Sequence, residues 1–277
     1  MLARVDPHNR THYWHDRRLP GLNLLHADFT RHDYAPHFHE ALVVAVTELG
    51  GSEFNSQGRT EEAGRTALLV FNPAEPHSGR MGRSDRWRYR SFYLSPPAIT
   101  AVMATLGVDA DPYFTRNLFT DPDLVAAFLA LHRALGEGRD PLLERELLVG
   151  SFGALIRRHA DIGHRVPVAP RDRTVFGATV ALMRDRHAEP LSLDDLGNAA
   201  GLTPFQLIRL FKRTAGLTPH AYLTQIRLQA AAQGLAAGRP IAEVALATGF
   251  YDQAALTRHF KRAHGITPRH YAAAMAG

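Results

Sequence analysis

The sequence predicts a multidomain α+β protein. We expect a small β-barrel or sandwich followed by helices, and then an all-α domain with two helix-turn-helix units. Three observations favour this fold class: short Val-, Leu-, Phe- and Tyr-rich segments fill the first hundred residues, amphipathic segments follow, and one block near the C-terminus occurs twice. The predicted N-terminal domain spans residues 1–160, a linker spans 161–173, and the C-terminal domain spans 174–277.

The predicted strands are short and are separated by Gly, Pro, Asn and Ser at hairpin-like spacing. They cover residues 21–29, 41–48, 51–56, 58–63, 66–72 and 86–94. Amphipathic helices are predicted at 122–138 and 140–160, and the second has an apolar stripe of Leu143, Leu147, Leu148, Phe152, Leu155 and Ile156. This stripe either packs against the preceding helix or pairs with a second chain, so a homodimer stays an open alternative.

Composition indicates a globular protein of the cytoplasm. The chain has 277 residues, of which 45% are hydrophobic and 21% charged, and it has no cysteine. Disulfides, thiolate nucleophiles and thiolate-bound zinc are thereby excluded. The polar N-terminus does not resemble a signal peptide, and the apolar runs are too short to cross a bilayer, so we expect no membrane association.

Positive charge is concentrated in the C-terminal part. Residues 171–277 contain thirteen Arg and Lys against seven Asp and Glu, whereas the remainder contains nineteen against twenty. A localised basic surplus indicates a polyanionic partner, and nucleic acid is favoured over a membrane because no basic amphipathic anchor is visible.

The duplicated block is LFKRTAGLTPHAY at 210–222 and HFKRAHGITPRHY at 259–271. In each copy a short helix and a glycine turn precede a second helix, which is the helix-turn-helix layout. Thr203 is predicted as an N-cap, with Pro204 at the first helical position. Leu207, Leu210 and Phe211 then point inward, as do Leu256, His259, Phe260 and Ala263 in the second copy.

The opposite face of each copy suits DNA. Arg209 and Arg258 can reach guanine edges in the major groove, while Gln suits adenine and Phe or Ala the thymine methyl. Phosphate contacts are expected from Lys212, Arg213, Lys261 and Arg262. The segment 218–238 joins the copies, and as a helix it spans roughly 28 Å, close to the ~34 Å between successive major grooves.

The segments GLTPFQLIRLFKRTAGLTPHAYL and IAEVALATGFYDQAALTRHFKRAHGITPRHY resemble the DNA-binding domain of the AraC/XylS family of transcriptional regulators. The resemblance covers about residues 174–271 and implies a seven-helix domain acting at promoters, with double-stranded promoter DNA and RNA polymerase as partners. It places Phe205, Gln206, Ile208, Arg209, Gln253, Ala254, Thr257 and Arg258 at base-facing positions. Ile208 and Ala254 are apolar, so readout there relies on methyl contact or DNA shape.

Segments 34–44 (YAPHFHEALVV) and 64–79 (GRTALLVFNPAEPHSG) resemble the two motifs of cupin barrels, the usual effector domain of that family. In metal-binding cupins two His, a Glu and a later His hold the ion. Here His37, His39 and His77 are present, but Val43 and Val44 stand where the Glu should be. The alternatives are a metal held by three histidines, a metal-free effector pocket, and histidines that only hydrogen-bond across the barrel mouth; we expect no metal and no cofactor.

Three aromatic residues, Trp87, Tyr89 and Tyr93, alternate along one predicted strand, so they either line the pocket or pack beneath it. A barrel mouth with His, Tyr and Trp suits a small polar effector such as an amino acid or a sugar. We therefore predict a sequence-specific DNA-binding regulator controlled by this effector, with no catalytic residues. The alternative is a metal-dependent cupin enzyme fused to a DNA-binding domain.

Overall fold

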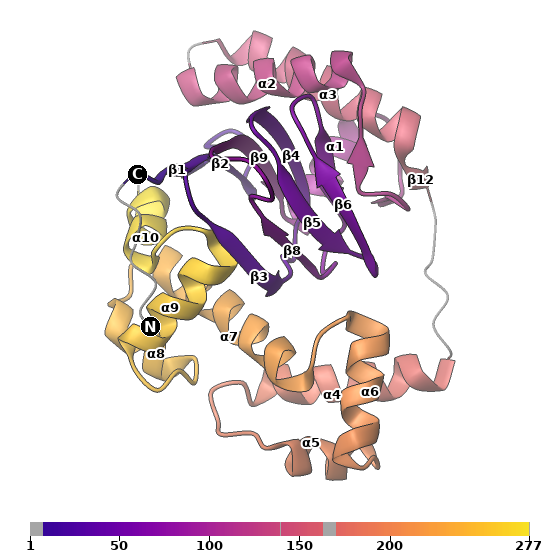
Figure 1. Cartoon of the computed structure of the whole chain (residues 1–277), viewed down its shortest axis with the longest axis vertical. Coiled ribbons are helices and arrows are strands. Elements are labelled where there is room, and N and C mark those ends of the chain that lie inside the picture. Colours follow the sequence, from indigo (N-terminus) through magenta and orange to yellow (C-terminus); the bar gives the residue numbers. More distant parts are fainter. Residues whose placement is uncertain (1–7, 139, 163–169, 277) are drawn as a thin grey trace. The chain divides into compact units, whose positions relative to one another are not determined.

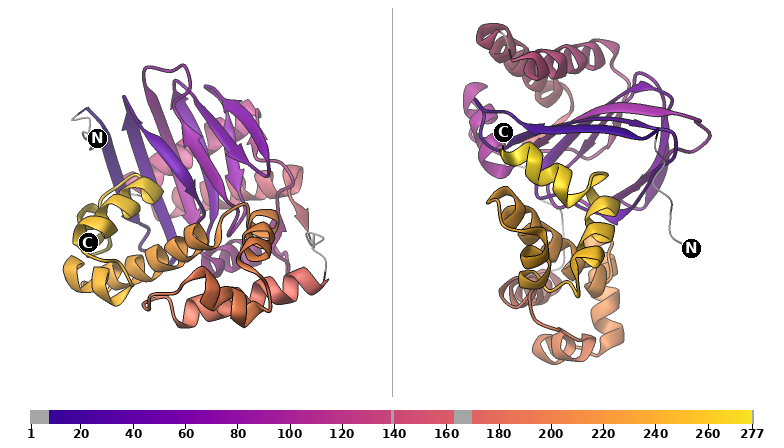
Figure 2. Two further views of the ribbon diagram at one scale, coloured as in Figure 1. Left: turned by 60° about the horizontal axis from the view of Figure 1, so that its bottom comes forward. Right: turned by 90° about the vertical axis from the view of Figure 1, so that its left-hand side faces the viewer.

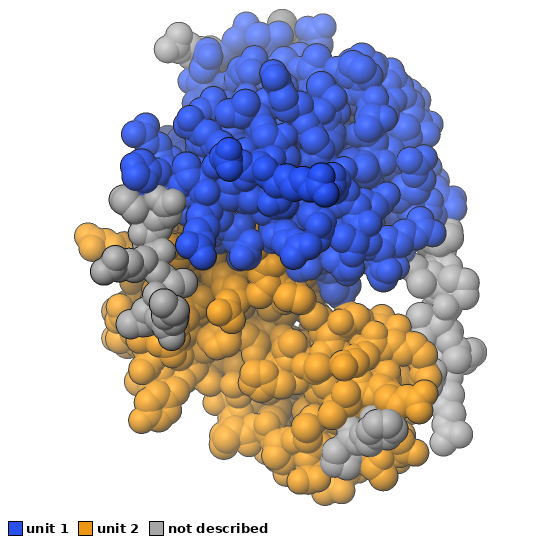
Figure 3. Space-filling model, viewed as in Figure 1, with its two compact units in different colours: residues 1–33, 39–165 blue, residues 34–38, 166–277 orange. Residues whose placement is uncertain are grey.

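The protein divides into two compact units. The structure, a computed structural model, describes residues 8–138, 140–162 and 170–276. Unit 1 comprises residues 1–33 and 39–165, and unit 2 comprises residues 34–38 and 166–277 (Figure 3).

The β-rich part contains two main sheets. One has six strands in the order β1-β2-β9-β4-β7-β11, and the other has four in the order β3-β8-β5-β6. The strands are β1 Arg10–His15, β2 Leu22–Phe29, β3 Asp33–His37, β4 Leu42–Leu49, β5 Ser52–Ser56, β6 Arg59–Ala63, β7 Leu68–Phe71, β8 His77–Arg80, β9 Trp87–Leu94 and β11 Leu118–Phe119. A separate small sheet joins β10 Pro112–Tyr113 to β12 Asp161–Ile162 in antiparallel fashion.

The two faces of the six-stranded sheet have different roles because side chains alternate along a strand. On one face Leu24, Val44 and Phe92 join a core with the helices α1 Pro96–Thr105, α2 Pro122–Glu137 and α3 Pro141–His159. Figures 1 and 2 show these helices gathered on one side of the sheet. On the other face Val43, Leu69 and Phe71 pack with Phe54 of β5, and they form the apolar interior between the sheets.

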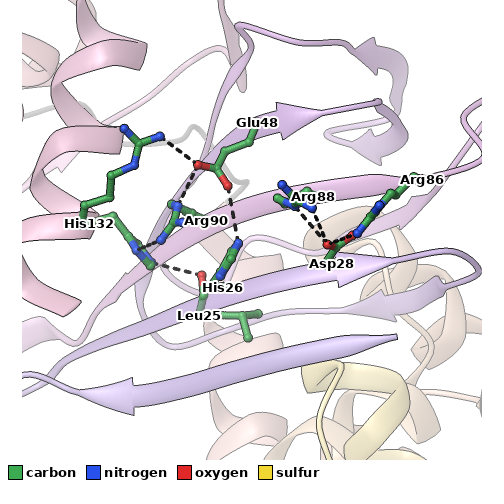
Figure 4. Close-up of polar contacts among 9 residues, drawn as sticks. Leu25, His26, Asp28, Glu48, Arg86, Arg88, Arg90 and His132 are labelled. Carbon is green, nitrogen blue, oxygen red and sulfur yellow. Dashed lines mark hydrogen bonds and ion pairs between the residues drawn. The ribbon is translucent and has the colours of Figure 1, made fainter. Parts of the chain in front are cut away.

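A polar cluster holds α2 to the sheet where the apolar core ends (Figure 4). Glu48 lies at a bulge of β4 and pairs with Arg90 (3.0 Å), Arg133 of α2 (3.2 Å) and His26 (3.4 Å). The fully buried His132 accepts a hydrogen bond from Arg90 at Nδ1 (3.0 Å) and donates from Nε2 to the Leu25 carbonyl (3.2 Å). Burial, followed by the positive charge of Arg90, lowers the pKa of His132 to about 3, so this imidazole is neutral.

Unit 2 contains seven helices within its described residues. They are α4 Pro170–Asp185, α5 Leu193–Ala200, α6 Pro204–Ala215, α7 Pro219–Ala236, α8 Ile241–Ala247, α9 Gln253–His264 and α10 Pro268–Ala276. One part of the core contains Leu196, Leu207 and Phe211, and Val244, Leu256 and Phe260 are buried in the second half. None of the helices described in either unit combines the length and apolarity of a membrane span.

The structure departs from the sequence prediction in several places. Strands β1, β3 and β8 and helix α1 were not predicted; β3 and β8 are rich in His, Pro, Gly and charged residues, which weaken the strand signal. The expected linker contains β12 at one end, and α4 already begins at Pro170. Of the predicted apolar stripe, Leu143 does not pack in the core of its own unit: it is 45% exposed, while its neighbour Glu144 is buried and pairs with Arg18.

Candidate DNA-binding surface and effector site

Helix α6 presents the first predicted DNA-reading face. Thr203 caps its N-terminus, as predicted, and Gly216 ends it with a φ of 65°, a conformation that glycine adopts without steric cost. The predicted inward residues Leu207, Leu210 and Phe211 are buried. On the opposite face Gln206, Arg209, Lys212 and Arg213 are exposed and Ile208 is half-buried. The side chain of Phe205 lies outside the part of the chain that the structure describes.

Helix α9 repeats this arrangement with small changes. Leu256, Phe260 and Ala263 are buried as predicted, whereas His259 is only half-buried. Gln253, Ala254, Arg258 and Arg262 are exposed, and Thr257 is half-buried. The two arginines expected to contact bases, Arg209 and Arg258, therefore occupy equivalent exposed positions on the two helices.

The N-caps of α6 and α9 use different chemistry. In α6 the side-chain oxygen Oε1 of Gln206 accepts a hydrogen bond from the backbone amide of Thr203 (3.0 Å). The backbone amide of Gln206 in turn donates to Thr203 Oγ1 (3.3 Å), which forms a capping box. In α9 the carboxylate of Asp252 accepts from the Ala255 amide (2.6 Å). The Gln206 carbonyl is thus used within the helix, which limits its ability to form a two-point contact with adenine.

The two lysines differ in exposure. Lys212 is exposed, whereas Lys261 is half-buried, and desolvation lowers the pKa of its ammonium group. Lys212 is therefore the better placed of the two for a phosphate contact in water.

Helix α7 lies between α6 and α9, the two helices that are predicted to read DNA (the reading helices). It is 18 residues long, or roughly 27 Å, and it contacts both α6 and α9. Figure 1 shows α7 running between them inside unit 2. Arg227 of α7 donates to the carbonyl oxygens of His187 (2.7 Å) and Glu189 (2.8 Å), just after α4. These bonds fix α7 within the helical unit, which keeps the separation of the reading helices constant.

One exposed aromatic residue was missed by sequence reasoning. Tyr251 is 92% exposed and directly precedes Asp252, the N-cap of α9. A large aromatic side chain left in water beside a reading helix is unusual. Its position in the turn segment GFYD, immediately before the helix, was the signal available in the sequence.

Within the barrel, His39, His77 and Tyr93 lie together. The ring of His39 is 5.4 Å from His77 and 5.1 Å from Tyr93, and His77 stacks on Phe71 at 4.0 Å. Burial lowers the pKa of His77 to about 4 and raises the pKa of Tyr93 to about 12. Both groups are therefore neutral near pH 7 and can form hydrogen bonds to a polar ligand.

Trp87 and Tyr89 belong to a different cluster. Both are buried, they stack on each other at 4.5 Å, and both rings lie near Phe29 at 6.4 and 6.1 Å. The two alternatives from the sequence, lining the pocket or packing away from it, therefore apply to different residues. Tyr93 lies with the histidines, while Trp87 and Tyr89 pack with Phe29 at the other end of β9.

His37 ends strand β3, which is hydrogen-bonded to β8, and only one residue separates it from His39. One ring nitrogen from each of His37, His39 and His77 lies within 4.8 Å of the others. The Nδ1 atoms of His37 and His77 contact the carbonyl oxygens of Ala35 (2.8 Å) and Glu75 (2.9 Å). Such bonds orient imidazoles with Nε2 as the acceptor, which suits either a ligand hydroxyl or a metal ion.

Two family models match the chain. An AraC-like ligand binding domain matches residues 19–150, and a helix-turn-helix domain matches residues 196–274. The first covers the strands from β2 to β11 with α1, α2 and just over half of α3, and the second covers most of α5 and the helices up to α10. Together with the paired reading helices, they define the class: transcriptional regulators with an N-terminal ligand-binding domain and a C-terminal helix-turn-helix DNA-binding domain.

The chain belongs to the AraC/XylS family, which confirms the resemblance found in the sequence. It is 30% identical over 219 residues to the uncharacterized HTH-type transcriptional regulator YbfI of Bacillus subtilis, covering 78% of this chain and 79% of YbfI. Over 97 residues it is 33% identical to the HTH-type transcriptional regulator MtrA of Neisseria gonorrhoeae, covering 35% and 32% of the two chains.

Solved structures agree on the fold. ToxT from Vibrio cholerae matches with a TM-score of 0.55 at 10% identity, covering 97% of this chain and 98% of ToxT. The unsaturated fatty acid bound form of ToxT matches with a TM-score of 0.55 at 8% identity, covering 98% and 97%. At these identities the likeness concerns the two-domain fold alone.

Proposed function

We propose that one chain reads two successive major grooves through α6 and α9. The observation that carries this proposal is the equivalent exposure of Arg209 and Arg258 on two capped helices joined by α7. Both arginines contact base edges, helped by Gln253, Ala254 and Thr257 on α9, by Phe205 and Ile208 on α6, and by the amide group of Gln206. Lys212, Arg213 and Arg262 bind phosphates, and the half-buried Lys261 adds a weaker contact.

The DNA test begins by selecting duplexes that the full chain binds from a random pool. The affinity of Arg209→Ala and Arg258→Ala for the selected duplex falls by about 1–3 kcal/mol, and discrimination at particular base pairs is lost. Lys212→Ala weakens selected and random duplexes alike and lowers the salt slope by about one unit. Equal losses on random and selected DNA for both arginine variants would contradict base reading.

The effector site is proposed at His37, His39, His77 and Tyr93, whereas Trp87 and Tyr89 pack with Phe29 at the other end of β9 and support the barrel wall. The neutral imidazole of His77 and the neutral phenol of Tyr93, beside apolar Phe71, suit a small polar molecule with an apolar side, such as an amino acid or a sugar. Thermal-shift measurements on the full chain against both compound classes test this. A ligand that stabilises the chain but not Tyr93→Phe supports the site, and shifts unaffected by Tyr93→Phe and His77→Gln place binding elsewhere.

The partners beyond DNA and effector follow from this role. The regulator acts in the cytoplasm, contacts RNA polymerase at the promoter, and divides into a barrel region at 1–160 and a helical region at 174–277. Most of the apolar stripe on α3 lies in the core of unit 1, so we place a homodimer contact on the exposed side of α3 at Leu143. Sedimentation of Leu143→Glu, compared with the unchanged chain, tests the dimer.

The three-histidine cluster supports a second candidate function, a metal-dependent cupin enzyme fused to the DNA-binding region. Its donor set resembles that of zinc sites with an open position, although the valines 43 and 44 supply no fourth ligand. Elemental analysis of the purified chain separates this enzyme from a regulator with a metal-free effector site. Stoichiometric zinc or iron that is lost in His39→Ala supports the enzyme, and a metal-free chain that still binds DNA excludes it.

A further inference from the structure

A half-buried carboxylate organises the loop between β7 and the candidate effector site. Glu75 lies two residues before His77. Its Oε1 accepts hydrogen bonds from Ser56 Oγ (2.6 Å) and Asn117 Nδ2 (2.6 Å), and its Oε2 accepts from Asn72 Nδ2 (2.6 Å) and the Asn72 amide (3.1 Å). Ser56, Asn72 and Asn117 are all buried. Four donors on one carboxylate make this a strongly constrained junction.

The same loop contacts both His39 and His77. The Glu75 carbonyl accepts from His77 Nδ1 (2.9 Å), and the Ala74 amide donates to the His39 carbonyl (2.7 Å). Ala74 has a φ of 59°, which is uncommon for a residue with a side chain. The surrounding hydrogen bonds hold this backbone conformation, so a shift of either histidine is transmitted to the loop.

Glu75 and Asn72 also bind the segment that follows β10. Asn72 Oδ1 accepts from the Phe114 amide (2.8 Å), and Asn72 Nδ2 donates to the Phe114 carbonyl (2.8 Å). Asn117 Nδ2 donates to the Val70 carbonyl (2.8 Å), and the Val70 amide donates to the Asn117 carbonyl (2.8 Å). Residues 114–117 are therefore tied to β7 and Glu75 from both ends.

Strand β10 ends directly before Phe114 and pairs with β12, Pro112 opposite Ile162 and Tyr113 opposite Asp161. Burial, followed by the negative charge of Glu75, raises the pKa of the Tyr113 phenol, as expected for a group near that carboxylate. After β12, the structure next describes the chain at Pro170, the first residue of α4. A continuous set of contacts thus leads from His77 through Glu75, Asn72 and Phe114 to the last strand before the DNA-binding region.

We infer that Glu75 is a positioning residue that couples the state of the His39–His77 site to the pairing of β10 with β12. In this scheme, which rests on the proposed effector site, ligand contact with the histidines changes the stability of the 72–76 loop. The loop in turn strengthens or weakens the pairing of β12 with β10. This changes how firmly the chain is held just before the helical region. A ligand acts through this device only if it binds one of the two states more tightly.

Hydrogen exchange of the full chain tests the coupling. In Glu75→Gln one acceptor oxygen is replaced by an NH2 group, so the two part-buried hydrogen bonds that this oxygen accepts are lost. Exchange in peptides covering 112–117 and 155–162 rises by at least about tenfold, while exchange in β4 and β9 is unchanged. Glu62→Gln makes the same chemical change at an exposed position of β6 and leaves exchange in both regions unaltered.

A milder variant addresses the histidine side without touching the carboxylate. His77→Gln replaces the ring that donates to the Glu75 carbonyl and stacks on Phe71, and it raises exchange at 155–162 in the same direction. If its effect stays within residues 72–77, or if Glu75→Gln leaves 112–117 and 155–162 unchanged, the coupling is refuted. Thermal-shift measurements with the effector candidates on the same samples separate this outcome from failure of the proposed effector site, because an unchanged chain that no ligand stabilises contradicts only the latter.

Discussion

The guanidinium of Arg227 lies against the backbone that follows α4, with Nε 2.7 Å from the carbonyl oxygen of His187. This contact ties the helix that joins the two DNA-reading helices to the start of the helical unit. It also leaves no space at Gly249, the turn residue of the second helix-turn-helix unit. A Cβ at Gly249 would lie 2.7 Å from that carbonyl oxygen and 2.8 Å from Arg227 Nε.

Gly249→Ala is therefore expected to destabilise the chain more than Gly238→Ala. Both glycines have positive φ, 79° and 74°, so each substitution costs about 1–2 kcal/mol of backbone strain. Only Gly249 adds a close approach, whereas nothing lies within 4 Å of a Cβ at Gly238. Overpacking adds about 1–3 kcal/mol. Urea denaturation of both variants checks this, and equal losses would contradict the proposed role of the Arg227 contact.

Gln206 is expected to act as a helix cap that leaves only its side-chain NH2 for a base edge, so it does not make the two-point contact that reads adenine. Gln206→Ala removes the acceptor for the Thr203 amide and costs about 0.5–1 kcal/mol, whereas Gln206→Glu keeps the acceptor and suits the helix N-terminus. Gln233→Ala, an exposed glutamine inside α7, serves as the control and has no such cost. Binding affinities are also measured for duplexes in which each adenine is replaced in turn. If Gln206→Ala loses the preference for one adenine, Gln206 does read that base.

Tyr251 is expected to contribute to DNA affinity without contributing to stability. Its side chain is 92% exposed, so Tyr251→Ala leaves the free energy of unfolding unchanged within about 0.5 kcal/mol. If its hydroxyl meets a phosphate beside α9, the loss of that bond weakens binding by about 0.5–1.5 kcal/mol. Leu246→Ala is the matched control, because Leu246 is 66% exposed on α8. Anisotropy titrations that show equal affinities for both variants would remove Tyr251 from the interface.

The buried His132 gives a pH dependence with a definite sign. Its folded pKa of about 3 lies below the unfolded value of 6.5, so the unfolded chain binds the proton more readily between these values. The contribution of His132 is fully present above pH 6.5 and is lost as the pH falls toward 3, at no more than about 1.4 kcal/mol per pH unit. Arg90 contacts this imidazole directly, and the charges of His26 and Glu48 also act on it.

In His132→Gln the side chain keeps one donor and one acceptor but cannot titrate. Its free energy of unfolding is expected to fall less steeply than that of the unchanged chain between pH 6 and pH 4.5. Denaturation at constant ionic strength measures the difference between the two proteins, in which the contribution of His77 cancels because both contain it. Parallel curves would show that His132 is protonated equally in the folded and unfolded states.

Sequence periodicity predicted the elements that have strong patterns. The repeat predicted both reading helices and their buried faces, because Leu207 and Phe211 recur at helical spacing as Leu256 and Phe260. Strands β2, β4 and β9 were predicted within one residue at each end, since their Val, Leu, Phe and Tyr content is high. Strand β8 was missed because HSGR carries no apolar alternation and is held by its pairing with β5.

The candidate sites were only partly predictable for a related reason. The pattern predicted that Trp87, Tyr89 and Tyr93 share one face, but not that Phe29 of another strand draws Trp87 and Tyr89 into a separate cluster. Likewise Glu75 and Asn117 are 42 positions apart, and nothing local in the sequence indicates that they meet. Contacts between distant segments depend on how the sheets close, which one-dimensional patterns do not encode.

The unequal caps of α6 and α9 have a consequence for the sequences that this regulator recognises. Helix α6 is capped by Thr203 and Gln206 and carries Ile208. Helix α9 is capped by Asp252 and carries Thr257 at the equivalent position. Since the two surfaces differ, a single subunit that reads DNA through both helices as proposed is not expected to favour a palindrome. The expected operator has a polarity, and inverting it in front of a gene reverses which of the two helices lies nearer the start of transcription.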